Sequence, residues 1–425
     1  MFLYIGSGEN KIGAFQVDEE TGNLIRTVEI VDPVIDRSLL PPPAEGMFSK
    51  WKSDKVQHPA TEWIMRHPTM DYMYAFTSFG SQQVAVVTTY HMDSATGRLT
   101  KLGVCSTGGL QAAYATFSPD LSLLVVVHHN DGRIAFFDCN ANGGVLEAPV
   151  RVVETPEVNA GTRSTATPTC LPSLYHCLYS ADGKYLLAVD ASKQSRIWTY
   201  PVDAHGMVLS NKPKYNAKIL PIRPPPGAVA SLITSSVFQS HGRLRRVAIH
   251  PNGRYLYVLF ETHSVIQVYE ITNQGKILLD CLQEIPAIDP SYFDRSAAPW
   301  NQKIAGAAFN MAAELLATPA GLWVSNRGVQ FLGNADNSMQ CYEYQDNGAR
   351  LVLSSRLEPQ GPVRHFAYCE EGGKTKIVAG MNKADPGLVE TFIKTEAGKF
   401  EKVGQAATGL DVLCLVVVPE VGEHV

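Results

Sequence analysis

Arginine, glutamate and histidine recur at two corresponding positions of a short phrase that this chain repeats. At the first position stand the residues Tyr175-His176, Arg245-Arg246, Ala313-Glu314 and Arg364-His365. At the second stand His128-His129, Asp190, Phe260-Glu261 and Asn326-Arg327. The planar fork of arginine holds a carboxylate or a phosphate through two parallel hydrogen bonds. The pattern therefore indicates a site for a small anionic molecule.

The phrase that positions these residues is an apolar strand, a turn of the Pro-Asp-Gly type and a second apolar strand. Its clearest copies are Tyr175–Asp190, Arg245–Phe260 and Ala113–Val127, and looser copies are Ile64–Phe76, Glu314–Asn326 and His365–Met381. A third apolar stretch, a turn with glycine and a fourth strand follow, as in Val84–Tyr90 with Leu99–Val104 and Val265–Ile271 with Ile277–Gln283. Four antiparallel strands in each repeat are typical of a β-propeller.

The repeats predict an all-β fold, a seven-bladed β-propeller in a single domain over residues 1–425. Six blades are expected near 61–106, 112–155, 173–220, 243–285, 312–357 and 363–405. The first blade combines 2–31 with the apolar run 410–419, so that the C-terminal strand joins the N-terminal blade. This closure removes the exposed strand edges that favour aggregation.

Four insertions, most of them rich in proline, interrupt the repeat at 32–60, 156–172, 213–242 and 286–311. Each falls between the last strand of one blade and the first strand of the next. These connections belong to the end of the ring where the innermost strands begin. They are either ordinary surface loops or segments that surround the entrance to the central channel.

The two recurring positions open onto that same end of the central channel, because strand one begins where strand two ends. Charged side chains in a narrow channel are costly unless they are paired or face a ligand. Each of them alone fits a structural ion pair, whereas the set favours an anion site.

The composition excludes several other classes. Lys and Arg number 36 against 41 Asp and Glu, a net charge of −5, which is unlike a general nucleic-acid-binding surface. The chain has no apolar run of about 18 residues that could span a membrane. Its start, MFLYIGSGENK, reads as a strand without a leader sequence. The 8 cysteines form no Cys-x-x-Cys pair, so we expect free thiols and a cytoplasmic protein.

No metal or organic cofactor is expected. His128 and His129 are adjacent, so their rings should point to opposite faces of a strand, which suits chelation poorly. Motifs for a serine nucleophile elbow, a dinucleotide fold or a phosphate-binding loop are missing from the sequence.

Five segments resemble the lactonase family of seven-bladed propellers, which includes 6-phosphogluconolactonases and 3-carboxy-cis,cis-muconate cyclases. They are YIGSGENKIGAFQVDEETGNL, LYHCLYSADGKYLLAVD, RLRRVAIHPNGRYLYVLFE, AELLATPAGLWVSNRG and GPVRHFAYCEEGG. The chain departs from the family pattern at Arg246, where histidine is usual, and at Phe260, where asparagine is usual.

The resemblance implies catalytic roles for His176, Arg245, Glu261 and Arg327. For a lactone reaction we expect the arginines to clamp the anion and Glu261, in a site of low dielectric, to have a raised pKa and act as acid or base. His176, whose ordinary pKa is near neutrality, is the alternative proton carrier. The predicted substrate-binding residues are His129, Asp190, Arg246, Glu314, Asn326, Arg364 and His365.

We therefore expect an enzyme that opens or forms the lactone ring of a small anionic substrate. The sequence does not choose between a hydrolase and an isomerase, and it leaves the oligomeric state open. The alternative is a non-catalytic propeller scaffold that binds a protein partner or a small anion.

Overall fold

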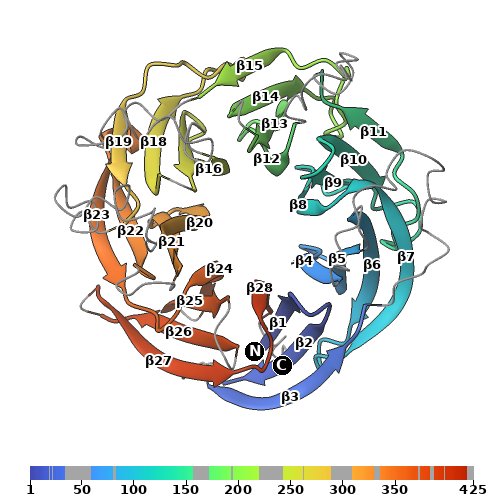
Figure 1. Cartoon of the computed structure of the whole chain (residues 1–425), viewed down its shortest axis with the longest axis vertical. Coiled ribbons are helices and arrows are strands. Elements are labelled where there is room, and N and C mark those ends of the chain that lie inside the picture. The colour runs from blue at the N-terminus through green and yellow to red at the C-terminus, as the bar shows by residue number, and fades with distance from the viewer. Residues whose placement is uncertain are drawn as a thin grey trace, which may run out of the picture.

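The computed structural model describes residues 1–18, 20–21, 23–33, 59–79, 83–156, 172–192, 195–219, 243–261, 263–288, 309–329, 336–371, 374–382, 387–396 and 398–418. Seven four-stranded antiparallel sheets stand around a central axis (Figure 1). The predicted fold, a seven-bladed β-propeller, is confirmed. Blades are numbered here from the one that holds the N-terminus.

The innermost strand of each blade lines the axis (Figure 1). These strands, for blades one to seven, are β28 (Val412–Val418), β4 (Ala60–Arg66), β8 (Ala112–Phe117), β12 (Leu174–Tyr179), β16 (Leu244–Ile249), β20 (Phe309–Thr318) and β24 (Val363–Glu371). The second strands are β1 (Phe2–Ser7), β5 (Tyr72–Phe79), β9 (Leu123–His128), β13 (Tyr185–Asp190), β17 (Tyr255–Phe260), β21 (Gly321–Val329) and β25 (Lys374–Met381).

The outer two strands complete each sheet. The third strands are β2 (Ile12–Val17), β6 (Val84–Met92), β10 (Arg133–Asp138), β14 (Arg196–Pro201), β18 (Val265–Glu270), β22 (Met339–Gln345) and β26 (Leu388–Lys394). The fourth strands are β3 (Leu24–Val31), β7 (Leu99–Leu110), β11 (Arg151–Glu154), β15 (Tyr215–Lys218), β19 (Gln283–Pro286), β23 (Arg350–Leu357) and β27 (Phe400–Ala407).

The core lies between neighbouring blades, which explains the apolar runs in the sequence. A second strand is covered by a blade on each face, and every residue of β17 (YLYVLF) is buried. Outer strands meet solvent on one side, so β27 has only two buried residues among eight. Burial on both faces selects continuous apolar runs, whereas half-burial selects alternation.

The ring closes through β28, as the sequence predicts. β28 pairs antiparallel with β1, from Phe2 opposite Val418 to Ser7 opposite Val412. The first blade thus combines the two ends of the chain. Its innermost strand also packs against β4 and β24 of the blades on either side.

Some predicted boundaries are wrong. The fourth strand of blade five is Gln283–Pro286 rather than Ile277–Gln283, because Ile277 only forms an isolated bridge with Ile271. The strand β15 and the first residues of β20 lie inside two predicted insertions. Most of the four insertions lies outside the described residues.

Two further findings concern only the part of the chain that the structure describes. It has no helix long and apolar enough to cross a membrane. Cys105, Cys139, Cys177, Cys281, Cys341 and Cys414 are free thiols, as expected.

Candidate functional site at the mouth of the ring

All seven innermost strands begin with an irregularity in their pairing with the second strand. In β12, for example, Leu174 pairs with Asp190 and His176 pairs with Val189, so Tyr175 is an extra residue. Such a β-bulge bends the strand and re-aims its side chains. The extra residues at the other bulges are Glu62, Ala113, Arg245, Arg364 and Leu413, and in β20 the irregularity covers Ala313-Glu314.

These bulges surround a small hollow, partly open to solvent, at the end of the ring where the innermost strands begin. We call this end the mouth. One residue from every bulge lines the hollow, and the residue after the bulge joins it in three blades. The lining consists of Glu62, Trp63, Gln111, Ala113, His129, Tyr175, Arg245, Arg246, Glu314, Arg364, His365 and Leu413.

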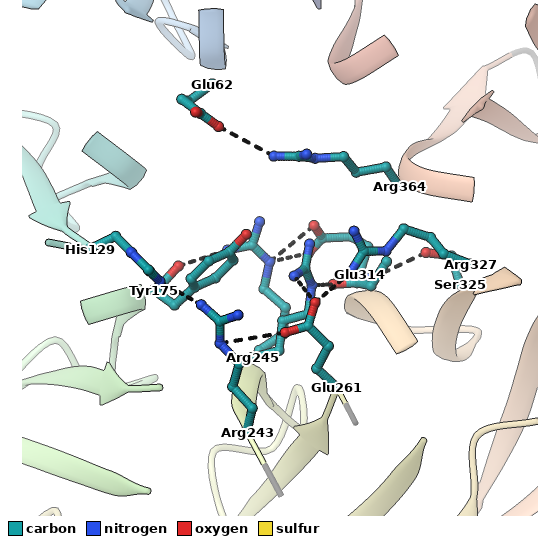
Figure 2. A network of polar contacts seen from close by, with 12 residues as sticks. Glu62, His129, Tyr175, Arg243, Arg245, Glu261, Glu314, Ser325, Arg327 and Arg364 are labelled. Carbon is teal, nitrogen blue, oxygen red and sulfur yellow. Dashed lines mark hydrogen bonds and ion pairs between the residues drawn. The ribbon is translucent and has the colours of Figure 1, made fainter. Parts of the chain in front are cut away.

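Three arginines from two blades gather on the carboxylate of Glu261, which follows β17. Arg245 Nη1 lies 2.6 Å from Oε1, Arg327 Nη2 donates to the same oxygen, and Arg243 Nε lies 3.5 Å from Oε2. Figure 2 shows the guanidinium groups turned toward this one carboxylate. Arg245 also donates to the carbonyl of Ala313. The cluster holds more positive than negative charge.

The pKa of Glu261 contradicts the expectation from the sequence. Burial by itself raises this pKa, but the charges of Arg245, Arg327 and Arg243 outweigh burial and lower it to about 2. The predicted raised pKa is therefore wrong. Near neutral pH Glu261 is a carboxylate that accepts hydrogen bonds, and it has no proton to donate.

A second cluster joins Arg246, Glu314 and His365. Arg246 Nε lies 2.9 Å from Glu314 Oε1, and its Nη1 donates to the carbonyl of Tyr175 at 3.1 Å. The guanidinium also stacks on aromatic rings, 4.6 Å from the ring centre of Tyr114 and 5.2 Å from that of Trp63. Arg246 is thus held on several sides at once.

His365 faces the hollow as a hydrogen-bond donor. Its Nδ1 accepts from the backbone N–H of Leu415 at 3.4 Å, which leaves the proton on Nε2, 4.0 Å from Glu314 Oε2. Burial lowers the pKa of His365 to about 4, with Arg246 and Arg364 acting in the same direction against Glu314. Neutral His365 therefore has no free lone pair toward the hollow.

His129 is also held by neighbours. Its Nε2 accepts from Arg243, and its Nδ1 lies 2.9 Å from Asn130 Oδ1. Burial lowers its pKa, so the ring is neutral with both nitrogens occupied. Its partner in the sequence, His128, is fully buried between Thr107 and the carbonyl of Arg133.

Arg364 is held more loosely than the other lining arginines. Its Nη2 lies 3.3 Å from Glu62 Oε2, and its side chain is 21% exposed, against 4% for Arg245 and Arg246. Figure 2 shows this pair across the mouth from the Glu261 cluster. Its guanidinium is accessible to an incoming anion.

Five predicted residues do not line the hollow. Glu261 and Arg327 lie in the arginine cluster described above, and the other three are Asp190, Asn326 and His176. Asp190 caps its own turn, accepting from the backbone of Ser173 and Ser192 at 2.9 Å each. Asn326 donates to the carbonyls of Ala287 and Ser338. His176 is buried, with its ring 4.2 Å from that of Tyr114, and burial beside Arg246 lowers its pKa well below the usual value.

The structure also adds residues that the sequence analysis did not assign to the site. Arg243 is the third arginine on Glu261, and Glu62, Trp63, Gln111 and Tyr175 line the hollow. Glu62 and Tyr175 occupy the same position of the repeat as Arg245 and Arg364, so alignment of the repeats could have identified them as site residues. Arg243 precedes the strand and had no such signal.

Charge at the mouth is unbalanced. Among the described residues, the guanidinium groups of Arg243, Arg245, Arg246, Arg327 and Arg364 face the carboxylates of Glu62, Glu261 and Glu314. Within this set the guanidinium groups outnumber the carboxylates by five to three. The arrangement favours an anionic ligand.

Known proteins share the sequence pattern and the fold of this chain. A family model described as lactonase, 7-bladed beta-propeller, matches residues 43–219 and 236–417. An uncharacterized protein of Staphylococcus aureus is 25% identical over 268 residues, which cover 62% of this chain and 63% of that protein. A 6-phosphogluconolactonase of Enterobacter is 25% identical over 174 residues, 41% of this chain and 45% of the enzyme. The chain thus matches less than two thirds of either relative's length.

Solved structures share the fold over almost the whole chain. The periplasmic gluconolactonase of Pseudomonas aeruginosa superposes with a TM-score of 0.67 at 18% identity, covering 98% of this chain and 99% of that one. A protein from Lactobacillus plantarum gives 0.66 at 15% identity, with 99% and 100% covered. At such identities the similarity shows the fold alone.

Proposed function

Because this chain belongs to the lactonase family of seven-bladed β-propellers, we propose that it hydrolyses the lactone ring of a small substrate that carries a phosphate or a carboxylate. The observation that carries the proposal is the excess of positive charge at the mouth, where three arginines share the single carboxylate of Glu261. Buried arginines of this kind recognise planar anions through paired hydrogen bonds.

Arg364 is the residue best placed to bind the anionic group of the substrate. It lines the hollow, and its pairing with Glu62 at 3.3 Å is loose enough to be exchanged for a phosphate. A phosphate monoester carries about −1.5 to −2 charges at neutral pH, and such an anion suits a site where guanidinium groups outnumber carboxylates.

Arg245 is the residue best placed near the reacting carbonyl. It lines the hollow beside the Glu261 cluster, and its two other contacts, to Glu261 and Ala313, fix its orientation. Negative charge develops on the carbonyl oxygen when water attacks a lactone, and a fixed guanidinium stabilises that charge. The proposed reaction uses protein side chains alone.

Hydrolysis is favoured over ring formation because a curated relative from Enterobacter is a 6-phosphogluconolactonase. Lactonisation, as in a muconate cyclase, needs the same anion clamp and is the second candidate function of the site. The predicted cytoplasmic location is part of the proposal, and fractionation of cells that make the protein would test it.

The proposal is tested by comparing two lactones that differ only in charge. Purified protein should open 6-phosphogluconolactone faster than the unphosphorylated gluconolactone, with spontaneous hydrolysis subtracted at each pH. We expect a preference of at least about tenfold in kcat/KM, which is about 1.4 kcal/mol of differential binding. Equal rates for both lactones would contradict the anion clamp. If the protein turns over neither of the two lactones and no muconate, the alternative function, a non-catalytic scaffold, is favoured.

A further inference from the structure

Opening a lactone requires a group that takes a proton from water and returns one to the ring oxygen that leaves. The residues to which the family resemblance assigns this work are poorly suited in this chain. Glu261 is held as a carboxylate by three arginines, with its pKa lowered to about 2. His176 is buried behind Tyr114 and does not line the hollow.

The two histidines that do line the hollow are also engaged. His365 presents an N–H to the hollow, because its Nδ1 accepts from Leu415. The Nε2 lone pair of His129 accepts from Arg243. Neither ring offers a free lone pair to a water molecule at the mouth.

Tyr175 also lines the hollow, and the geometry points to it: we propose that the phenol of Tyr175 is the proton-transfer group of this site. This inference rests on the proposed hydrolysis of a lactone. Tyr175 is the extra residue of the bulge in β12, it is half-buried, and it lines the hollow. Figure 2 shows its ring between His129 and the arginines.

Positive charge from the neighbouring blade lies against this ring. The guanidinium carbons of Arg245, Arg243 and Arg246 lie 4.8, 5.5 and 5.7 Å from its centre. Such contacts with a π face are attractive, and positive charge nearby also favours the phenolate over the phenol.

The balance of these influences favours deprotonation. Burial raises the pKa of Tyr175, as does the charge on Glu261, but Arg245, Arg364 and Arg246 outweigh both, so that the pKa lies below its ordinary value of 10.0. The titratable or charged groups that face the ring are His129, Arg243, Arg245, Arg246, Glu261, Arg327 and Arg364.

The proposed step balances with water as the only co-reactant. The phenolate of Tyr175 takes a proton from water while the water oxygen bonds to the lactone carbonyl carbon. The bond from that carbon to the ring oxygen then breaks, and Tyr175 returns its proton to the ring oxygen. The product is a hydroxy acid, which releases its carboxyl proton to solvent.

The test is Tyr175→Phe, which keeps the ring and its contacts with the guanidinium groups but removes the hydroxyl. Its matched control is Tyr200→Phe, because Tyr200 lies in β14 of the same blade, fully buried and away from the hollow. General acid–base groups contribute about 10²–10⁴-fold. We expect kcat to fall by at least about 100-fold in Tyr175→Phe and to stay unchanged in Tyr200→Phe.

A pH profile separates catalysis from packing. In the wild type, kcat/KM should rise with pH through the pKa of Tyr175, and this limb should be lost in Tyr175→Phe. The difference in tyrosinate absorbance between the wild type and Tyr175→Phe should show one phenol that titrates below pH 10. This titration should coincide with the rise of kcat/KM in the wild type.

The failures are distinguishable. If Tyr175→Phe keeps the wild-type rate and profile on a lactone that the wild type hydrolyses, the inference is overturned and the proposed function stands. The inference is also overturned if the phenol seen in the absorbance difference titrates at or above the ordinary pKa of tyrosine. A wild type that opens no lactone contradicts the proposed function, and the inference falls with it.

Discussion

Glu261 is the residue on which the mouth of the ring depends. It is nearly fully buried and pairs with Arg243 and Arg245 of β16 and its lead-in, and with Arg327 of β21. Removing its charge would leave several buried guanidinium groups without a counter-charge, and uncompensated buried charge of this kind costs about 3–5 kcal/mol.

Glu261→Gln should therefore destabilise the protein in a pH-dependent way. The pKa of Glu261 is about 2 in the folded protein, against an ordinary value of 4.5. Its ion-pair stabilisation is fully present above pH 4.5 and is lost as the pH falls toward 2, an effect of about 3 kcal/mol. Urea unfolding of wild type and variant should differ strongly at pH 7 and much less at pH 3. An equal difference at both pH values would contradict the lowered pKa.

Arg364 should affect substrate binding more than protein stability, because it is partly exposed and loosely paired. In Arg364→Ala, KM for a phosphorylated lactone should rise about tenfold or more, since a charge-assisted contact to phosphate is lost. KM for the uncharged lactone should stay nearly constant. Arg254→Ala is the control, because Arg254 forms an exposed pair with Glu270 away from the hollow. A similar rise in KM for both lactones would contradict this role.

At the scale of elements, the bulges decide which side chains reach the mouth. In a regular strand Arg245 and Arg246 would point to opposite faces, and one of them would leave the channel. The bulge at β16 makes Arg245 an extra residue, so that both arginines line the hollow. The repeat indicated where the strands begin, but a bulge depends on pairing with the neighbouring strand, and the sequence alone does not show that register.

The turns at the opposite end of the ring should matter for stability and not for catalysis. Gly253 has φ +77, and an added Cβ would lie 2.8 Å from the Cβ of Ala181, whereas Gly398 has φ +79 and open space. Gly398→Ala should cost about 1–2 kcal/mol for its backbone alone, and Gly253→Ala should cost more. Thermal unfolding measures both, and kcat/KM should not change. A drop in kcat/KM for Gly253→Ala at temperatures where it is fully folded would contradict the structural role of the turn.

At the scale of the whole molecule, the closure by β28 holds the ring together. β28 covers the edge of β1, and Val412, Cys414 and Leu415 are buried between the first, second and seventh blades. Without it, β1 would present unpaired backbone groups and an apolar surface, which favours aggregation.

Deletion of residues 410–425 should therefore give aggregated protein or a much lower Tm, whereas deletion of 419–425 leaves β28 in place and serves as the control. Size-exclusion chromatography and thermal unfolding measure the difference. A synthetic peptide of residues 410–418 should partly restore the Tm of the shorter chain by pairing with β1. A deletion of 410–425 that unfolds like the control would show that β28 is dispensable.

The sequence by itself determined the ring, its seven blades, its closure and the end at which the charged residues gather. It did so because each blade repeats one apolar pattern, and burial between neighbouring blades imposes that pattern locally. Six predicted site residues, Arg245, Arg246, Glu314, Arg364, His365 and His129, line the hollow.

Only the tertiary structure decided the chemistry of those residues. The pKa of Glu261 is a balance between burial and the charges of arginines from two blades, one of them 66 residues away in the chain. His129 and His365 also form hydrogen bonds with residues of other blades, Arg243 and Leu415. A repeat pattern shows which residues lie at the mouth, whereas their protonation depends on distances between blades that no local pattern encodes.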